Sequence, residues 1–172
     1  MGTRADVTWV QAALARYERP LIRYAVRITG DLESARDVVQ DTFLRLCAAN
    51  RAKVDNHLAA WLYTVCRNRA LDVRKKEAHM EPLTAVEAET VESRAQAPSR
   101  AAANREAHAL VLEALSSLPG QEQEAFQLKF QDELSYREIG QVMGVSLGTV
   151  SKLVAGALDA IRQQLRGKLD LT

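Results

Sequence analysis

The feature that most constrains the fold is a break in helical periodicity near the middle of the chain. Apolar residues recur at spacings of three and four before residue 81 and after residue 104, which predicts amphipathic helices on both sides. Residues 81–104, EPLTAVEAETVESRAQAPSRAAAN, contain two prolines, few large apolar side chains and no period, as is typical of a linker. Because no stretch alternates as a strand does, the sequence predicts an all-α protein of two small helical domains joined by a flexible linker.

The predicted N-terminal domain covers residues 1–80 and the predicted C-terminal domain covers residues 105–172. In the first domain we expect helices over about 7–28, 31–49 and 56–77, with a loop at 51–57. Pro20 lacks an amide hydrogen and is expected to break or kink the first helix. Asp31 is the expected N-cap of the second helix.

Charge and composition favour some partners and disfavour several classes of protein. Residues 1–80 carry 14 Lys and Arg against 9 Asp and Glu, which suits an anionic partner, whereas residues 105–172 carry 7 against 9. Cys47 and Cys66 have no CxxC spacing, so we expect buried thiols rather than a metal or redox site. The histidines match no triad, and no glycine loop cradles a phosphate, so we expect no enzyme, no cofactor and no small-molecule substrate. With no signal-peptide pattern and no membrane-spanning apolar run, we expect a cytoplasmic protein without a membrane partner.

Residues 134–153, LSYREIGQVMGVSLGTVSKL, have the spacing of a helix-turn-helix. Ser135 and Glu138 form a predicted capping box, Gly140 permits a close helix crossing, and Gly144 permits the positive φ of a tight turn. The residues predicted to face duplex DNA are Arg137, Leu147, Thr149, Ser151 and Lys152. Because basic charge is sparse here and phosphate contacts supply much of DNA affinity, a plain helical hairpin remains the alternative.

Residues 60–76, AWLYTVCRNRALDVRKK, begin as an apolar helix and end as a basic one. At 100° per residue the predicted core stripe contains Leu58, Trp61, Leu62, Val65 and Cys66. The opposite strips contain Tyr63, Arg67 and Arg74, and Thr64, Asn68 and Lys75. Cations hold phosphates, amides read base edges and rings stack on unpaired bases, so this face suits a DNA strand. The alternative is a solvated helix whose cations complement its C-terminal dipole.

Three blocks in this order resemble the sigma-70 family of bacterial RNA polymerase subunits, and in particular its extracytoplasmic-function group. They are GDLESARDVVQDTFLRL (30–46), AWLYTVCRNRALDVRKK (60–76) and LPGQEQEAFQLKFQDELSYREIGQVMGVSLGTV (118–150). The resemblance implies a promoter-specificity subunit that binds core RNA polymerase, recognises promoter DNA, helps to melt it, and catalyses nothing. It also implies that the linker lies in the RNA exit path of the polymerase. Because no sensory domain follows Thr172, we expect control by a separate protein such as an anti-sigma factor.

The resemblance assigns residues to three surfaces. The polymerase-binding surface would contain Asp37, Gln40, Asp41, Leu44 and Arg45. The surface for the minus-ten element would contain Lys53, Asn56, His57, Arg67, Asn68, Asp72, Arg74 and Lys75, with Tyr63 added from the helical projection. Asp72 is also expected to pair with Arg69 or Lys76. The helix-turn-helix residues would read the minus-thirty-five element.

The sequence departs from the family after Val150, where the family usually has a basic run. Here residues 151–156 read SKLVAG, which puts strong minus-thirty-five binding in doubt and leaves three alternatives: weak DNA binding, an unusual element, or reliance on polymerase contacts. A second function is also kept open, namely a stand-alone helix-turn-helix regulator that binds duplex DNA without polymerase, as a dimer. The faintly acidic C-terminal domain argues against that alternative.

Overall fold

The computed structural model describes residues 4–80 and 101–169, and within these ranges it contains helices and no strand. The predicted all-α fold is confirmed. The chain divides into two compact units. The front lobe consists of α1 to α4, and the rear lobe of α5 to α8. Of the predicted linker, residues 81–100 lie outside the described residues, whereas residues 101–104 already belong to a helix.

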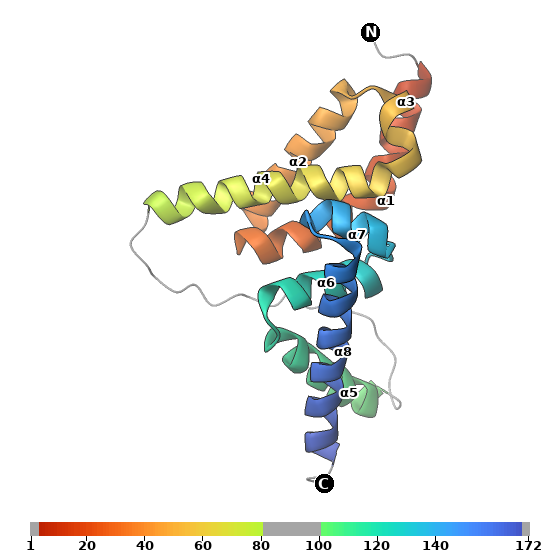
Figure 1. Cartoon of the computed structure of the whole chain (residues 1–172). Helices are drawn as coiled ribbons and strands as arrows, with labels where there is room; N and C mark the ends of the chain where they lie inside the picture. The colour runs from red at the N-terminus through yellow and green to blue at the C-terminus, as the bar shows by residue number, and fades with distance from the viewer. Residues whose placement is uncertain (1–3, 81–100, 170–172) are drawn as a thin grey trace. The chain divides into compact units, whose positions relative to one another are not determined.

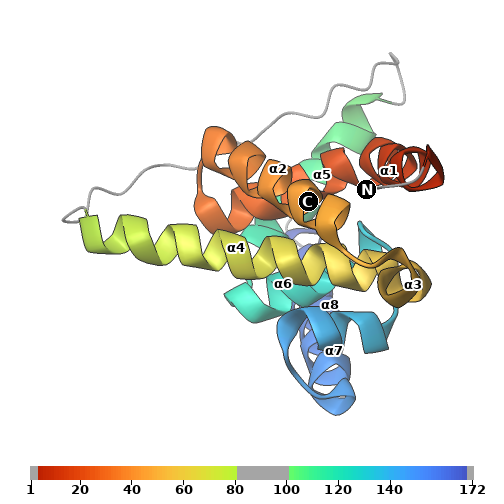
Figure 2. The same cartoon turned by 90° about the horizontal axis from the view of Figure 1, so that it is seen from above.

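The front lobe is a bundle of three long helices with one short insertion. Its elements are α1 (Arg4–Thr29), α2 (Leu32–Ala48), α3 (Arg51–Val54), the 3-10 turn η1 (Asp55–His57) and α4 (Leu58–Met80). Helix α1 packs against both α2 and α4, and α2 also packs against α4. Figures 1 and 2 show that the C-terminal end of α4 extends past α1 and α2, which leaves its last turns open on several sides.

The structure corrects two predictions about the front lobe, because Pro20 does not break the first helix and residues 51–57 are not a loop. Helix α1 continues through Pro20 to Thr29 as one element, so this proline does not end the helix. It costs a backbone hydrogen bond, which the packing of α1 against α2 and α4 offsets. Residues 51–57 are not an irregular loop, because they form α3 and η1, with the Asn50 side chain accepting a hydrogen bond from the Ala52 amide at the start of α3.

The front core brings apolar side chains from all three long helices together. Leu21 and Tyr24 of α1, Leu46 of α2, and Leu62 and Cys66 of α4 are all buried. Burial raises the pKa of the Cys66 thiol to about 12, which keeps it protonated at neutral pH. Cys47 was also predicted to be buried, but it is exposed near the end of α2. There it lines a pocket together with polar side chains such as Asn50 and Arg51.

The rear lobe contains four helices, of which the last two form the helix-turn-helix. They are α5 (Ala101–Ser116), α6 (Gly120–Phe130), α7 (Tyr136–Met143) and α8 (Leu147–Leu169). Helix α8 packs against both α5 and α6. One cluster of this core joins α5, α6 and α8 and consists of Ala114, Leu115, Leu118, Phe126, Ala157, Ala160, Ile161 and Leu165. Within the described ranges no single helix is long and apolar enough to cross a membrane, and only the bent pair α7–α8 meets that test jointly.

Candidate functional site

The middle of α2 exposes a mixed polar and apolar strip. The helix begins at Leu32 because the Asp31 carboxylate accepts a hydrogen bond from the Ser34 amide at 2.7 Å, as predicted for its N-cap. Asp37, Gln40 and Leu44 are exposed along the strip. Leu44 is 62% exposed although the helix buries a full core face, so this leucine contributes little to the core. Such a side chain beside polar groups suits a protein contact.

Asp41 does not lie free on this strip. Its Oδ2 atom lies 3.2 Å from Arg69 Nε on α4 and 3.4 Å from Arg45 Nε on α2. The Asp41 side chain is 35% exposed, so the pair is partly shielded from solvent. Asp72 was expected to pair with Arg69 or Lys76, but Arg69 pairs with Asp41 and thereby ties α4 to α2. No local sequence signal marks this contact, because the partners are far apart in the chain.

The predicted outward face of α4 is correct in part and wrong at Tyr63. The Tyr63 side chain is only 1% exposed, and its ring packs edge-on against Tyr24 of α1 with centroids 5.2 Å apart. The predicted core stripe was centred too far from this residue. Since α4 packs against two helices at once, its buried face is wide enough to include Tyr63 as well as Leu62 and Cys66. Tyr63 therefore presents no ring to an unpaired base in this structure.

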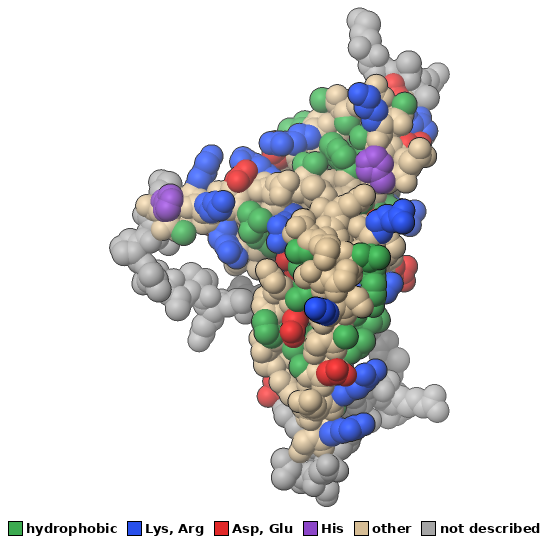
Figure 3. All heavy atoms as spheres, viewed as in Figure 1, with side chains coloured by type: hydrophobic (Ala, Val, Ile, Leu, Met, Phe, Trp, Pro, Cys, Tyr) green, Lys and Arg blue, Asp and Glu red, His purple; other side chains and the backbone are tan. Residues whose placement is uncertain are grey.

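The remaining α4 residues form a basic, exposed surface towards the C-terminal end of the helix. Arg67 is half-buried, whereas Asn68, Asp72, Arg74 and Lys75 are exposed. Figure 3 shows Lys and Arg side chains gathered over this part of the front lobe. Lys53, Asn56 and His57, which precede α4, are also exposed. An amide among cations is suited to bind a nucleic-acid backbone and to read base edges.

Serine side chains cap both helices of the helix-turn-helix, and the first of these caps is the predicted capping box. The Ser135 hydroxyl accepts a hydrogen bond from the Glu138 amide at 3.2 Å, while the Glu138 carboxylate accepts one from the Ser135 amide at 2.8 Å. This is a complete capping box, and it fixes where α7 begins. At the second helix, the Ser146 hydroxyl accepts a hydrogen bond from the Thr149 amide at 3.2 Å and so caps α8.

Two glycines set the angle between α7 and α8, which is 102°. Gly144 ends α7 with φ of 68°, a left-handed conformation that favours glycine. A Cβ atom on Gly140 would lie 2.9 Å from the backbone oxygen of Val145, which is too close for any side chain. Val150 is fully buried behind this crossing. The helix-turn-helix geometry predicted from the sequence is thus confirmed in each of these details.

The outward side of the helix-turn-helix is exposed but carries little charge. The predicted residues Arg137, Thr149, Ser151 and Lys152 are all exposed, and the Leu147 side chain is 59% exposed. The Thr149 hydroxyl lies 2.8 Å from that of Ser146. Lys152 is the cation that α8 offers in its first two turns. Across the described part of the chain, no group of three His, Cys, Asp or Glu side chains could hold a metal ion.

Comparison with protein families covers both lobes. Residues 13–79 match Sigma-70 region 2, and residues 114–163 match Sigma-70, region 4. SigL of Mycobacterium tuberculosis, an extracytoplasmic-function (ECF) sigma factor, is 30% identical over 167 residues, which span 94% of this chain and 92% of SigL. The chain belongs to the ECF group of the sigma-70 family. The resemblance seen in the three sequence blocks is thereby confirmed.

Further relatives agree with this assignment of the sigma factor. The ECF sigma factor SigW of Bacillus subtilis is 26% identical over 159 residues, covering 87% of this chain and 85% of SigW. The fold resembles that of the sigma factor RpoE in a co-crystal structure with the anti-sigma factor NepR from Bartonella quintana. That match has a TM-score of 0.63 at 21% identity and covers 91% of this chain and 96% of RpoE.

The family match also settles the class of function. The sigma factor is a promoter-recognising subunit of RNA polymerase, with core RNA polymerase and promoter DNA as its partners. Sigma factors are non-enzymatic subunits of transcription initiation. The alternative of a stand-alone helix-turn-helix regulator is not favoured, because region 2 is matched in the front lobe as well as region 4 in the rear lobe.

Proposed function

We propose that the front lobe performs two tasks on two neighbouring helices, binding polymerase with α2 and holding the melted minus-ten element with α4. The observation that carries this proposal is the pair of exposed surfaces on one small lobe, an apolar–acidic strip on α2 and an amide–cation strip on α4. The proposed domains are residues 1–80 for these tasks, residues 81–100 as linker and residues 101–172 for the minus-thirty-five element, since α5 begins at Ala101.

The proposed polymerase contact centres on Leu44. Its largely exposed side chain lies between polar neighbours, as an apolar anchor with a polar rim does in a protein interface. The full proposed set is Asp37, Gln40, Asp41, Leu44 and Arg45. Within this set the side chains of Asp41 and Arg45 already form an ion pair, so each helps to orient the other.

The proposed minus-ten contact combines the end of α4 with the segment before it. The cations would hold phosphates of the unpaired strand, while Asn68 offers both a donor and an acceptor to a base edge. The proposed set is Lys53, Asn56, His57, Arg67, Asn68, Arg74 and Lys75. Tyr63 is removed from it because its ring is buried. Asp72 is kept as a neighbour that limits the positive charge of the strip.

The proposed minus-thirty-five contact is the first two turns of α8 together with Arg137 of α7. Thr149, Ser151 and Lys152 can donate hydrogen bonds in a major groove, and Leu147 can contact a thymine methyl group. With so few cations this surface would bind weakly alone, so we propose that it acts only when the front lobe is anchored on polymerase.

The remaining parts of the proposal concern regulation and location. We propose that the protein catalyses no reaction, works in the cytoplasm where polymerase is, and is controlled by an anti-sigma factor. The support for the last point is the similarity in fold to RpoE, which was solved with an anti-sigma factor bound.

The proposal is tested by reconstitution with core RNA polymerase. The full chain should comigrate with core polymerase in gel filtration and direct transcription from a library of randomised promoters. Leu44→Glu should weaken polymerase binding by about tenfold or more, the size expected for losing a central apolar anchor. Leu32→Glu is the matched control, since Leu32 is also an exposed leucine of α2 but lies outside the strip. Asp41→Arg is less informative, because it would also break the tie to Arg69.

A second variant separates the two front surfaces. Asn68→Ala should leave polymerase affinity unchanged and reduce promoter opening, measured by permanganate reactivity of unpaired thymines. Gln163→Ala, which removes another exposed amide far along α8, should change neither. A loss of polymerase affinity in Asn68→Ala would mean that α4 is a polymerase contact, contrary to the proposal.

A further inference from the structure

The segment between α2 and α4 is built from elements that cannot hold their shape alone. Helix α3 has four residues and η1 has three, both far below the length at which an isolated helix is stable. Within residues 51–57 only Val54 is buried. The orientation of this segment must therefore come from contacts with other parts of the front lobe.

Trp9, in the first turns of α1, supplies such contacts to Arg51 and Asp55 of the segment. Its indole Nε1 donates a hydrogen bond to the Asp55 carboxylate at 2.8 Å. The Arg51 guanidinium lies over the indole ring, 5.5 Å from the centroid, and Arg51 Nε lies 3.7 Å from the Asp55 carboxylate. Three side chains from two distant stretches of sequence thus form a closed cluster, in which one indole contacts both α3 and η1.

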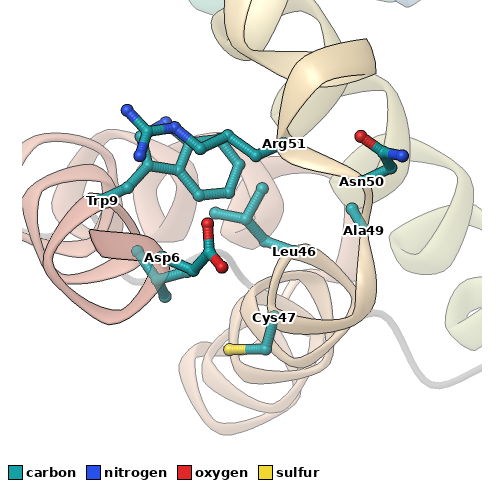
Figure 4. A pocket seen from close by; sticks show the side chains of 8 residues that line it. Asp6, Trp9, Leu46, Cys47, Ala49, Asn50 and Arg51 are labelled. Atoms are coloured by element: carbon teal, nitrogen blue, oxygen red, sulfur yellow. The ribbon is translucent and has the colours of Figure 1, made fainter. Parts of the chain in front are cut away.

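The space beside this cluster is not filled by apolar packing. A pocket of about 350 Å³ lies between the start of α1, the end of α2 and the start of α3, and Trp9 and Arg51 both line it. Figure 4 shows the Arg51 guanidinium beside the Trp9 ring, with Asp6 on the same side of the pocket and Cys47 across it. Because apolar packing is incomplete beside it, the cluster of Trp9, Arg51 and Asp55 links α1 to the segment.

We propose that Trp9 is a positioning residue that sets the orientation of residues 51–57 for reading the minus-ten strand. This rests on the proposed function, in which Lys53, Asn56 and His57 face that strand. Lys53 lies between the two anchored residues Arg51 and Asp55, and the other two follow Asp55 directly. Trp9 itself touches no DNA, and it acts by fixing the backbone that carries these three side chains.

Hydrogen exchange of the full-length free chain tests the structural half of the proposal. Trp9→Phe keeps an aromatic ring for Arg51 but removes the donor to Asp55. Amides of residues 51–57 should exchange about two- to tenfold faster, the population change expected from losing one hydrogen bond. Tyr17→Phe removes a polar atom from another partly exposed ring of α1, outside the cluster, and should leave that exchange unchanged. Unchanged exchange in Trp9→Phe would overturn the proposal.

A double-mutant cycle separates this cluster from a general loss of packing. Asp55→Ala should speed exchange at least as much as Trp9→Phe does, because it removes the bond to the indole and also the ion pair with Arg51. The double variant should exchange little faster than Asp55→Ala alone, because the indole bond is already lost. Asp55→Asn keeps an acceptor for the indole and should restore part of the protection. Fully additive effects of the two single variants would contradict a shared role.

The functional half is tested in the assembled holoenzyme with a promoter library randomised across the minus-ten element. Trp9→Phe should bind core polymerase as the natural chain does, open promoters about two- to tenfold less and select fewer fixed bases. Unchanged base selection would overturn the role in reading DNA. Failure of the unmutated chain to bind polymerase would instead overturn the proposed function, and the exchange experiment would still decide whether Trp9 holds the segment.

Discussion

The front and rear lobes offer two different kinds of surface to a nucleic acid. The end of α4 offers exposed charge, with Arg74 and Lys75 on a helix that extends past its neighbours. The first turns of α8 offer a defined shape with one cation, held by two glycines and two serine caps. Binding through charge tolerates many sequences and weakens as the salt concentration rises. A fixed helix-turn-helix adds selectivity but little affinity. Substitutions in the two lobes should therefore have different effects on DNA binding and on stability.

The largest effect is expected from destroying the shape of the rear lobe. Gly140→Val would place its Cβ atom 2.9 Å from the backbone oxygen of Val145. Because backbone cannot yield as a side-chain end can, we expect a loss of about 3 kcal/mol in the unfolding free energy of the rear lobe. Urea denaturation followed by amide NMR signals of each lobe measures this loss, and the front lobe should be unaffected.

Gly167→Ala is the matched control for that substitution. A Cβ at Gly167 meets nothing within 4 Å, and alanine is the better helix former, so the rear lobe should be no less stable. Equal losses in the two variants would show that the rear lobe depends on glycine flexibility in general and not on the close crossing at Gly140.

The next effect concerns the salt dependence of DNA binding, which should differ between the two lobes. In the holoenzyme, changing Arg74 and Lys75 together to Gln should reduce the slope of log affinity against log salt by about 1.4, at about 0.7 per single-strand phosphate contact. Lys152→Gln should reduce it by about 0.9, the value for one duplex contact. Arg162→Gln is the control, because Arg162 is exposed far along α8 and pairs with Asp159. A larger change for Lys152 than for the α4 pair would mean that the rear lobe, and not the front lobe, supplies more of the charge-dependent affinity.

Local chemistry explains what could be predicted from the sequence. The Asp31 cap, the Ser135–Glu138 box and the positive φ of Gly144 each depend on residues within a few positions of one another. Their geometry depends on local hydrogen bonds and backbone conformation, which residue type and spacing reveal. For the same reason the place of the helix-turn-helix and the exposed side of α8 agree with the sequence prediction.

Long-range packing explains what could not be predicted. A helical projection of α4 assumes one buried face, but α4 packs against α1 and α2 together, and this broad contact buries Tyr63. The tie between Asp41 and Arg69 and the cluster around Trp9 join residues that no spacing rule relates. Helix α3 is too short for periodicity to reveal, and packing keeps α1 helical through Pro20.

A smaller effect is expected from the cap of α7. Ser135→Ala removes the oxygen that accepts from the Glu138 amide, which should cost the rear lobe about 1 kcal/mol of unfolding free energy. Ser116→Ala is the control, because the Ser116 hydroxyl only donates to a carbonyl within the last turn of α5 and should change stability by less than about 0.5 kcal/mol. A cost at Ser135 no larger than at Ser116 would mean that packing alone fixes the start of α7.

The smallest effect contrasts this neutral serine cap with the charged cap of the front lobe. Hydrogen bonds from the Ser34 amide and side chain lower the pKa of the Asp31 carboxyl in the folded protein. A carboxyl with a lowered folded pKa stabilises the fold above its unfolded pKa of about 3.9, and this contribution is lost as pH falls through the folded value. Asp31→Asn keeps an acceptor without the charge, so the natural chain should be slightly more stable above pH of about 5 and the two should converge in acid. Front-lobe urea midpoints measured from neutral pH into acid decide this, and a constant difference would show that the charge of Asp31 contributes nothing.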